Sequence, residues 1–239
     1  MLRAARIAHT ALMPVSLSFA GETLVPLACG GLFWPAQQAL LVADLHFEKA
    51  SAFARRGRFL PPYDSAETLR CLIDALEATG ARRVFCLGDS FHDAGGPARL
   101  PDGPRAALQA LTASLDWLWI TGNHDDAAGA ALGGRVMAEA AIGPLMLRHE
   151  AVPGDPAPEL SGHFHPKVAV AIRGRRIVRR CFATSATKII LPAYGAFTGG
   201  LEIADPAYAA VFPEAVTAVV RERDRLLRFP VPRGAIAAE

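Results

Sequence analysis

The chain has 239 residues, of which 51% are hydrophobic and 20% charged, a composition typical of a globular protein with a substantial core. It contains no apolar run of the ~18 residues that a membrane-spanning helix needs, so we expect no membrane segment. A net charge of +2 is too small to indicate a nucleic-acid partner by itself. We predict a single domain over residues 1–239, with residues 1–15 as a candidate flexible extension.

The cysteines are widely spaced and include no C-x-x-C pair, which indicates free thiols in a reducing compartment; they are Cys29, Cys71, Cys86 and Cys181. The first residues, "MLRAARIAHTALMPVSLSFAGE", place two arginines before a modest apolar stretch, as a weak signal peptide would. His9, Thr10 and Pro14 interrupt that stretch, and its end suits a first hairpin. We therefore expect a cytoplasmic protein.

Short apolar runs that end in polar residues recur along the first part of the chain. They are "ALLVADLHF" at 39–47, "RVFCLGDSFHD" at 83–93, "LWITGNHDD" at 118–126 and "LMLRHE" at 145–150. Such runs are typical of buried strands, and open α/β sheets carry their functional residues at the strand ends. The runs therefore predict a sheet with a site along one edge.

Helices are predicted between these strands. The clearest covers residues 62–79 and has one apolar face formed by Leu69, Leu72, Ile73 and Leu76. We expect Asp64 or Ser65 to cap its start and Gly80 to end it. Residues 104–114 predict a second helix in the next crossover.

After Pro166 the pattern changes to alternating strands. The stretch "KVAVAIRGRRIVRRCFATS" predicts a hairpin that turns at Arg173 and Gly174, and further strands are expected in "KIILPAYG" and "AVTAVVRERDRLLRFPV". The stretch "AVPGDPAPE" at 151–159 predicts a Pro-rich loop, because it is too short to link two domains. A half built of βαβ units is thus followed by a β-rich half, which predicts an α/β fold.

The segment "SGHFHP" at 161–166 places two of the seven histidines, His163 and His165, close together. On an extended segment the side chains of residues i and i+2 point to the same side, so the two imidazoles can share one target. Neutral imidazole is a common metal ligand, which favours a metal site. The alternative is a loop in which two solvated histidines lie together by chance.

Five segments supply side chains that can bind metals, and six of the seven histidines lie in or beside them. Each segment alone has an ordinary explanation, since "GD" and "GN" are common turn pairs and a single histidine is more often structural. Their joint occurrence at the ends of successive predicted strands instead predicts a metal centre. The candidate ligands are Asp44, His46, Asp89, Asn123, His149, His163 and His165.

The order of these segments, D-x-H, GD-x-x-H/D, GNH-D/E, H and GH-x-H, resembles the calcineurin-like metallophosphoesterase superfamily. All five blocks are present between residues 44 and 165. More narrowly, "LLVADLHFEKAS", "GDSFHD" and "LPAYGAFTGGL" resemble the bacterial ligase-associated DNA damage response endonuclease family, PdeM. The resemblance implies an α/β fold in which two mixed β-sheets flanked by helices form a four-layer αββα sandwich.

The resemblance also implies two divalent metal ions as cofactors, bound by two ligand sets that share Asp89 as a bridge. The two sets are Asp44, His46, Asp89 and His165, and Asp89, Asn123, His149 and His163. Manganese is favoured by the resemblance, and the mixed ligands also suit iron, zinc or cobalt. Two such ions about 3.5–4 Å apart can hold a hydroxide between them for in-line attack on phosphorus.

Two further histidines match residues that face the substrate in this superfamily. For His124 the resemblance implies a general acid that protonates the leaving oxygen. His92 matches a histidine of the DNA-repair nucleases, which implies a secondary catalytic role. Asp93, Asp125 and Glu150 are candidates to orient histidines, and the alternative for each is an ordinary solvated or turn-capping carboxylate.

The function that the resemblance implies is a phosphodiesterase that cleaves DNA as an endonuclease in DNA damage repair. Basic clusters at 49–58 and 173–180 favour such a substrate, although solvated surfaces are often this basic. The alternatives are a phosphoesterase for small molecules such as nucleotides or cyclic nucleotides, and a non-catalytic interaction module. The expected partners are DNA and, from the resemblance, a DNA ligase or helicase, with a homodimer as a candidate assembly and no membrane.

Overall fold

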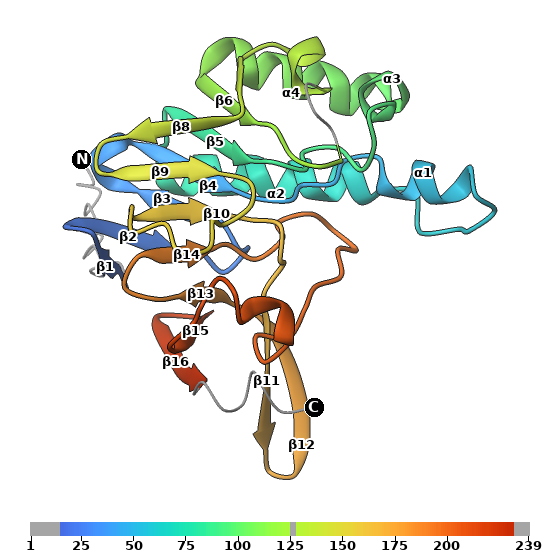
Figure 1. Ribbon diagram of the computed structural model, residues 1–239. Coiled ribbons are helices and arrows are strands. Elements are labelled where there is room, and N and C mark those ends of the chain that lie inside the picture. The colour runs from blue at the N-terminus through green and yellow to red at the C-terminus, as the bar shows by residue number, and fades with distance from the viewer. Residues whose placement is uncertain (1–14, 125–127, 232–239) are drawn as a thin grey trace, which may run out of the picture.

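The computed structural model describes residues 15–124 and 128–231, which form two seven-stranded sheets, a separate two-stranded hairpin and several short helices (Figure 1). Residues 1–14, which contain almost all of the expected N-terminal extension, lie outside that part. Within it, no helix is long and apolar enough to cross a membrane.

The first sheet contains seven strands in chain order. Its first four strands form an antiparallel meander, and the fourth continues into a parallel half whose crossovers carry the helices. The strands are β1 (Leu17–Phe19), β2 (Glu22–Pro26), β3 (Leu32–Trp34), β4 (Ala39–Val42), β5 (Arg83–Leu87), β6 (Asp116–Ile120) and β7 (Arg135–Met137).

The second sheet has the order β16-β15-β13-β14-β10-β9-β8 and is mixed, because β10 is parallel to both β9 and β14. Its strands are β8 (Glu139–Ile142), β9 (Leu145–Arg148), β10 (Glu159–Ser161), β13 (Phe182–Thr184), β14 (Lys188–Ile190), β15 (Val216–Glu222) and β16 (Arg225–Val231). The predicted hairpin is present as β11 (Lys167–Ile172) and β12 (Arg175–Arg180), and it projects from the body of the molecule (Figure 1).

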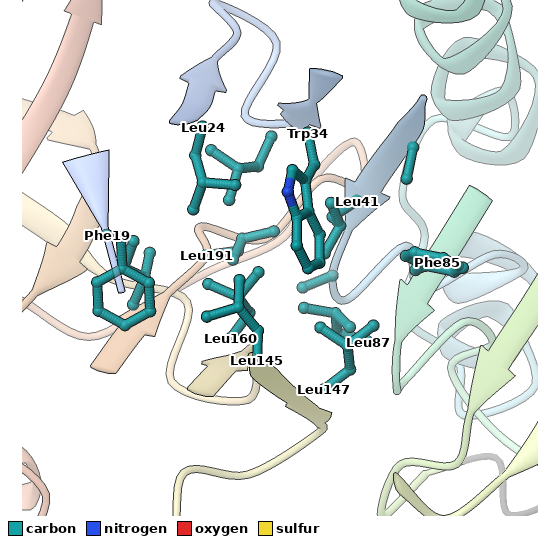
Figure 2. Close-up of a cluster of buried hydrophobic side chains, with 14 of the residues drawn as sticks. Phe19, Leu24, Trp34, Leu41, Phe85, Leu87, Leu145, Leu147, Leu160 and Leu191 are labelled. Carbon is teal, nitrogen blue, oxygen red and sulfur yellow. The ribbon is translucent and has the colours of Figure 1, made fainter. Parts of the chain in front are cut away.

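The two sheets pack face to face through a continuous apolar core. Trp34, Leu41 and Phe85 from the first sheet meet Leu147 and Leu160 from the second, and all five side chains are buried (Figure 2). Fully burying side chains of this size is worth roughly 1.5–3 kcal/mol each relative to exposure. This core holds the strand ends of the two sheets in fixed relative positions.

The sheets are also joined through their backbones just after β4 and β14. Ala43 forms a parallel bridge with Ala193, and the N–H of Tyr194 donates to the carbonyl of Ala43 at 2.8 Å. The N–H of Gly195 then donates to the carbonyl of Asp44 at 3.2 Å. The loop that carries the first two candidate ligands is therefore fixed by both sheets.

Helices cover the outer face of the first sheet. They are α1 (Lys49–Ala54), α2 (Asp64–Thr79), α3 (Gly96–Arg99) and α4 (Asp102–Ser114), accompanied by the short 3-10 helices η1 (Pro35–Gln37) and η2 (Ala128–Leu132). A third 3-10 helix, η3 (Pro206–Tyr208), lies against the second sheet. Leu72 of α2 and Leu108 of α4 are buried in a second core with Val84 and Trp117 of the sheet. The predicted apolar face of α2 is confirmed by this packing.

The predicted fold class is confirmed as two mixed sheets with helices, and the outermost layer on the second sheet is thinner than the other. Within the described residues it consists of the segment around η3, whose Tyr208 and Phe212 pack with Ala183 and Ala218 of the sheet. Irregular chain rich in large apolar side chains thus does the work of a helical layer.

The expected caps of α2 are only half correct. Gly80 ends the helix in the left-handed conformation, as predicted. Asp64 and Ser65 do not cap α2, which begins after Tyr63 without a side-chain cap. Their oxygens instead accept hydrogen bonds from the start of α1, Asp64 from the N–H of Ala50 and Ser65 from the N–H of Glu48. Sequence proximity favours the local cap, but the adjacent helix start offers buried N–H groups that need partners.

Candidate metal centre

The seven candidate ligands come from the carboxyl ends of strands in both sheets. Three strands of the first sheet are followed by Asp44 and His46, by Asp89, and by Asn123, respectively. Two strands of the second sheet are followed by the remaining three, His149, His163 and His165. Because β4, β5 and β6 are parallel, as are β9 and β10, their ends lie along a common edge.

One group of ligands forms around the loop after β4. The Nε2 of His165 lies 3.2 Å from Oδ1 of Asp44 and 3.3 Å from Nε2 of His46. Asp44 and His46 are buried, and His165 is partly exposed. A carboxylate and two imidazoles therefore point at one small volume.

A second group forms beside the first. The amide oxygen of Asn123 lies 2.9 Å from Nε2 of His149 and 3.0 Å from Nδ1 of His163, and these two nitrogens are 3.2 Å apart. Oδ1 of Asp89 is 3.5 Å from Nε2 of His149. Asp44, Asp89 and His149 also have ligand atoms within 4.8 Å of one another, so the carboxylate common to both groups is Asp44. The bridging role of Asp89 stays a prediction.

The donor atoms fit divalent cations. Nδ1 of His149 lies 3.0 Å from the carbonyl of Leu87, which can only accept, so this nitrogen carries a proton and, in the neutral ring, Nε2 presents a lone pair to the cluster. The facing imidazole nitrogens and the carboxylate and amide oxygens place several lone pairs together. Such a set is stabilised by a positive charge between its members, which a cation supplies.

The charges of the cluster shift the pKa values of its members in opposite directions. Burial lowers the pKa of His46 to about 2, with the nearby His165 acting in the same direction. Burial also disfavours charged His149, but its contacts with Asp89 and Asp44 outweigh burial and raise its pKa to about 9. For Asp89, burial is likewise outweighed, here by hydrogen bonds from His149 and the backbone of His124, and the pKa is about 2.

His124 lies at the open side of the cluster, with 42% of its side chain exposed. Its backbone N–H donates to Oδ1 of Asp89 at 3.0 Å, and its Nδ1 lies 3.1 Å from the carbonyl of His92. Because a carbonyl only accepts, Nδ1 carries the proton, while Nε2 lies 3.9 Å from Oδ2 of Asp89. The ring is therefore held with Nε2 toward the ligands.

The ring of His92 stacks on that of His124, with centroids 5.4 Å apart and an angle of 19° between the planes. On its other sides it contacts His46 at 5.5 Å and Phe53 at 5.3 Å. Burial, followed by the positive charge of Lys49, lowers the pKa of His92 to about 4, so the ring is neutral at pH 7.

The chain was compared with known proteins. No protein-family model and no curated protein matches it. Among solved structures, the nuclease MPE of Pseudomonas putida is 33% identical, and the match covers 89% of this chain and 98% of that chain with a TM-score of 0.69. The chain belongs to the calcineurin-like metallophosphoesterase superfamily. Yfce, a phosphoesterase from E. coli, is 13% identical over 81% of this chain and 98% of its own, with a TM-score of 0.42.

Membership of the metallophosphoesterases and the ligand cluster together make the protein a metal-dependent phosphoesterase or nuclease. The chemistry is consistent with the ligand types. Two divalent ions would bring a charge of +4, of which the carboxylates of Asp44 and Asp89 would offset two, while asparagine and neutral histidine would add none. A site loaded in this way would be net positive and would attract an anionic phosphoester.

The backbone of this metallophosphoesterase is strained around the site. The φ angles of five of the seven candidate ligands are positive: Asp44, His46, Asp89, His163 and His165, with values from 45° to 70°. Residues other than glycine rarely adopt this conformation, and such strain is concentrated at functional sites. The extended segment expected for "GHFHP" is therefore wrong. The left-handed turns at His163 and His165 direct the two rings into different ligand groups.

Two glycines allow the ligand loops to approach one another. A Cβ on Gly122 would overlap Oδ1 and the backbone nitrogen of Asp89, and a Cβ on Gly162 would lie 2.6 Å from Oδ2 of Asp44. Each glycine directly precedes a candidate ligand in the sequence. The pairs "GN" and "GH" thus include a packing requirement, which for "GN" the turn interpretation does not capture.

The three carboxylates considered as orienting partners differ in their contacts with the ligand histidines. Asp93 accepts a hydrogen bond of 2.7 Å from Arg99 and does not contact a ligand histidine in the described part of the chain. Oε1 of Glu150 lies 3.7 Å from Nε2 of His163, a position from which it can orient that ring. Asp125 lies outside the described residues.

The sequence reasoning missed two groups at the site. Phe53 packs against His92, and the carbonyl of Leu87 fixes His149. Phe53 lies six residues after Phe47 of the first motif, and nothing in the sequence distinguishes it from an ordinary core phenylalanine. A backbone carbonyl leaves no signal in the sequence at all.

Proposed function

We propose that this metallophosphoesterase is a phosphodiesterase that cleaves DNA, as an endonuclease in DNA damage repair. The observation that carries the proposal is His92, a neutral imidazole stacked on His124 at the open side of the site. The 33% identity to a nuclease over most of both chains supports it. An aromatic, uncharged group beside the cluster suits a diester, which carries one charge fewer than a monoester.

The seven clustered side chains would hold two divalent cations, with manganese as the proposed metal. When bound, these ions supply an activated water and offset the charge of the phosphoryl oxygens. The buried carboxylates of Asp44 and Asp89 would provide the negative charge that retains them. Glu150 would orient His163 from outside the cluster.

His124 would act as the general acid. Its Nδ1 proton is committed to the carbonyl of His92, so a second proton must reside on Nε2, the nitrogen that faces the site. From there it would pass to the leaving oxygen as the phosphorus–oxygen bond breaks. His92 would contribute in two ways, since its carbonyl orients His124 and its ring stacks behind it.

The proposal is tested by hydrolysis assays with metal-stripped protein to which manganese is returned. The substrates are bis-p-nitrophenyl phosphate, p-nitrophenyl phosphate and a DNA strand. We expect metal-dependent turnover of the small diester and of DNA. Turnover of the monoester alone, with DNA left intact, would replace the proposal with a phosphatase for small molecules.

A further inference from the structure

The segment that follows the first metal motif carries an unusual surface. Within residues 49–63, here called the α1 rim, Phe59 is 85% exposed, and Arg55, Arg56 and Arg58, close to it in sequence, are exposed too. A large aromatic ring exposed to water costs free energy, and surfaces that bind single-stranded nucleic acid combine such rings with positive charge. Figure 1 shows α1 and the loop after it extending beyond the strand ends.

The α1 rim adjoins the part of the site that contains His92 and His124. Nζ of Lys49 lies 5.8 Å from the ring centroid of Phe53, and that ring contacts His92. The positive charge of Arg56 also reaches His92, where it adds to burial and Lys49 in lowering the pKa. The rim that carries the exposed arginines is therefore in contact with the stacked pair of histidines.

The rim is held in place by buried polar contacts. The N–H groups of Glu48 and Ala50 donate to Ser65 and Asp64 at 2.8 and 2.9 Å. The N–H of Arg58 donates to the carbonyl of Phe53 at 3.0 Å, which closes the turn that presents Phe59. Because the rim is already ordered, binding a flexible strand there costs less conformational entropy than binding to a mobile loop would.

At its far end the rim meets the second half of the chain. The ring of Tyr63, which is 58% exposed, lies 6.0 Å from the ring of Phe197, which is 43% exposed. Aromatic surface thus continues from the rim onto the segment after β14. Phe59 lies on the rim itself, among the arginines, and is far more exposed than either member of this pair.

We propose that the α1 rim binds a single polynucleotide strand, with Arg55, Arg56 and Arg58 on its phosphates and Phe59 stacked on an unpaired base. The bound part would be the portion that leaves, because Phe53 of the rim contacts His92, whose ring stacks on His124, the proposed general acid. This inference rests on the proposed function and adds the residues that position its substrate. The positive charge of the rim complements a polynucleotide, which decides against a second copy of this equally basic surface.

The test of Phe59 compares two strands with the manganese-loaded full chain. One is an oligothymidylate, and the other has the same phosphates but abasic sugars. For Phe59→Ala, kcat/KM on oligothymidylate relative to bis-p-nitrophenyl phosphate should fall about tenfold, and the ratio for the abasic strand should not. Phe59→Trp should restore the ratio on oligothymidylate. The control is Leu227→Ala, which removes a large exposed apolar side chain outside the rim, 40% exposed, and should keep both ratios.

The test of the arginines uses salt. Each phosphate contact on a single strand contributes about 0.7 to the slope of log affinity against log salt, so replacing all three rim arginines with alanine should reduce that slope by about 2. The control replaces Arg223, Arg225 and Arg228 of the β15–β16 hairpin, which are also exposed; it removes the same charge elsewhere and should leave the slope at its wild-type value.

Several outcomes would overturn the inference. Equal losses for Phe59→Ala on the two strands would show that Phe59 does not stack on a base. Equal losses on DNA and on the small diester would show that the rim does not bind DNA. A change from dimer to monomer in sedimentation, with the substrate ratios retained, would make the rim an interface between copies. Cleavage of DNA that ignores the rim variants overturns this inference alone, whereas a wild type that cleaves the diester and neither strand also overturns the DNA part of the proposed function.

Discussion

Strand β10 connects two buried polar clusters that differ in whether their charges are paired. At its start, Glu159 accepts from Lys188 and Arg148, both at 3.0 Å, and Arg148 also binds Asp155 at 2.9 Å. Beyond its end, the histidine nitrogens of the metal centre face one another at 3.2 and 3.3 Å. The first cluster pairs opposite charges, whereas the second brings several imidazole nitrogens together, an arrangement that favours binding of a cation. Buried polarity indicates a binding site where like groups face one another, and a structural role where opposite charges meet.

The largest expected effect is that of removing a candidate ligand from the metal centre. Asp89→Ala should leave activity below about 1% of wild type, because even partners outside the ligand set typically cost 10–100-fold. It should also lose both ions, as measured by elemental analysis of the dialysed protein. Full metal content in this variant would contradict the ligand assignment.

His124→Ala should separate chemistry from metal binding. Turnover of the small diester should fall about 10²–10⁴-fold, the range typical of a positioned general acid. The metal content should equal that of the wild type, since His124 contacts the ligands through its backbone N–H, which alanine retains. Unchanged turnover would remove His124 from the mechanism.

In the ion-pair cluster around Glu159, a substitution should change the stability of the fold. Glu159→Ala leaves Lys188, which is 3% exposed, and Arg148 without their shared carboxylate. Removing one partner of a buried ion pair costs about 3–5 kcal/mol, to be measured by urea unfolding. The folded variant should bind metal as the wild type does. Loss of metal without loss of stability would show that the two ends of β10 are not distinct.

A smaller effect is expected from crowding the metal centre. Gly122→Ala would press a methyl group against Asp89, and overpacking of this kind typically costs about 1–3 kcal/mol. The matched control is Gly103→Ala in α4, where a Cβ would meet nothing within 4 Å. Thermal unfolding should distinguish the two variants, and equal melting temperatures would contradict the close approach.

The pH dependence of stability should differ between metal-free and loaded protein. Asp89, with a pKa lowered from 3.8 to about 2, stabilises the fold above pH ~4 and loses that contribution as pH falls toward 2. His149, with a pKa raised from 6.5 to about 9, contributes fully below pH 6.5 and loses its contribution as pH rises through 9.

The metal-free protein should therefore be most stable near pH 6.5. Its stability should fall toward acid pH, because folded His46 and His92 resist protonation, and should weaken by roughly 1–3 kcal/mol toward pH 9. Metal replaces the proton on His149, so manganese should abolish the loss on the alkaline side. Melting temperatures from pH 5 to 9, with chelator or with manganese, measure both branches. Equal melting temperatures at pH 6 and pH 9 in chelator would contradict the raised pKa of His149.

Sequence reasoning predicted the side chains that the structure brings together and missed how the backbone presents them. Apolar runs ending in Asp44, Asp89 and Asn123 were enough to predict a sheet with ligands along one edge, because strand periodicity and residue type are both local properties. The left-handed turn at His163 was not predictable, since the conformation is unfavourable by itself and exists through contacts with distant segments. The same applies to Asp64 and Ser65, whose partners became available only after α1 had packed.

The backbone bridge between Ala43 and Ala193 has a consequence for the order of folding. It connects positions 150 residues apart, and the ligands themselves come from loops spread over positions 44 to 165. Contacts of such long sequence separation form slowly, because a large loop must close before they contribute. The chain must therefore dock its two halves before a cation finds its full set of partners. Metal uptake should consequently be a late event of folding, and its rate a direct report on completion of the native topology.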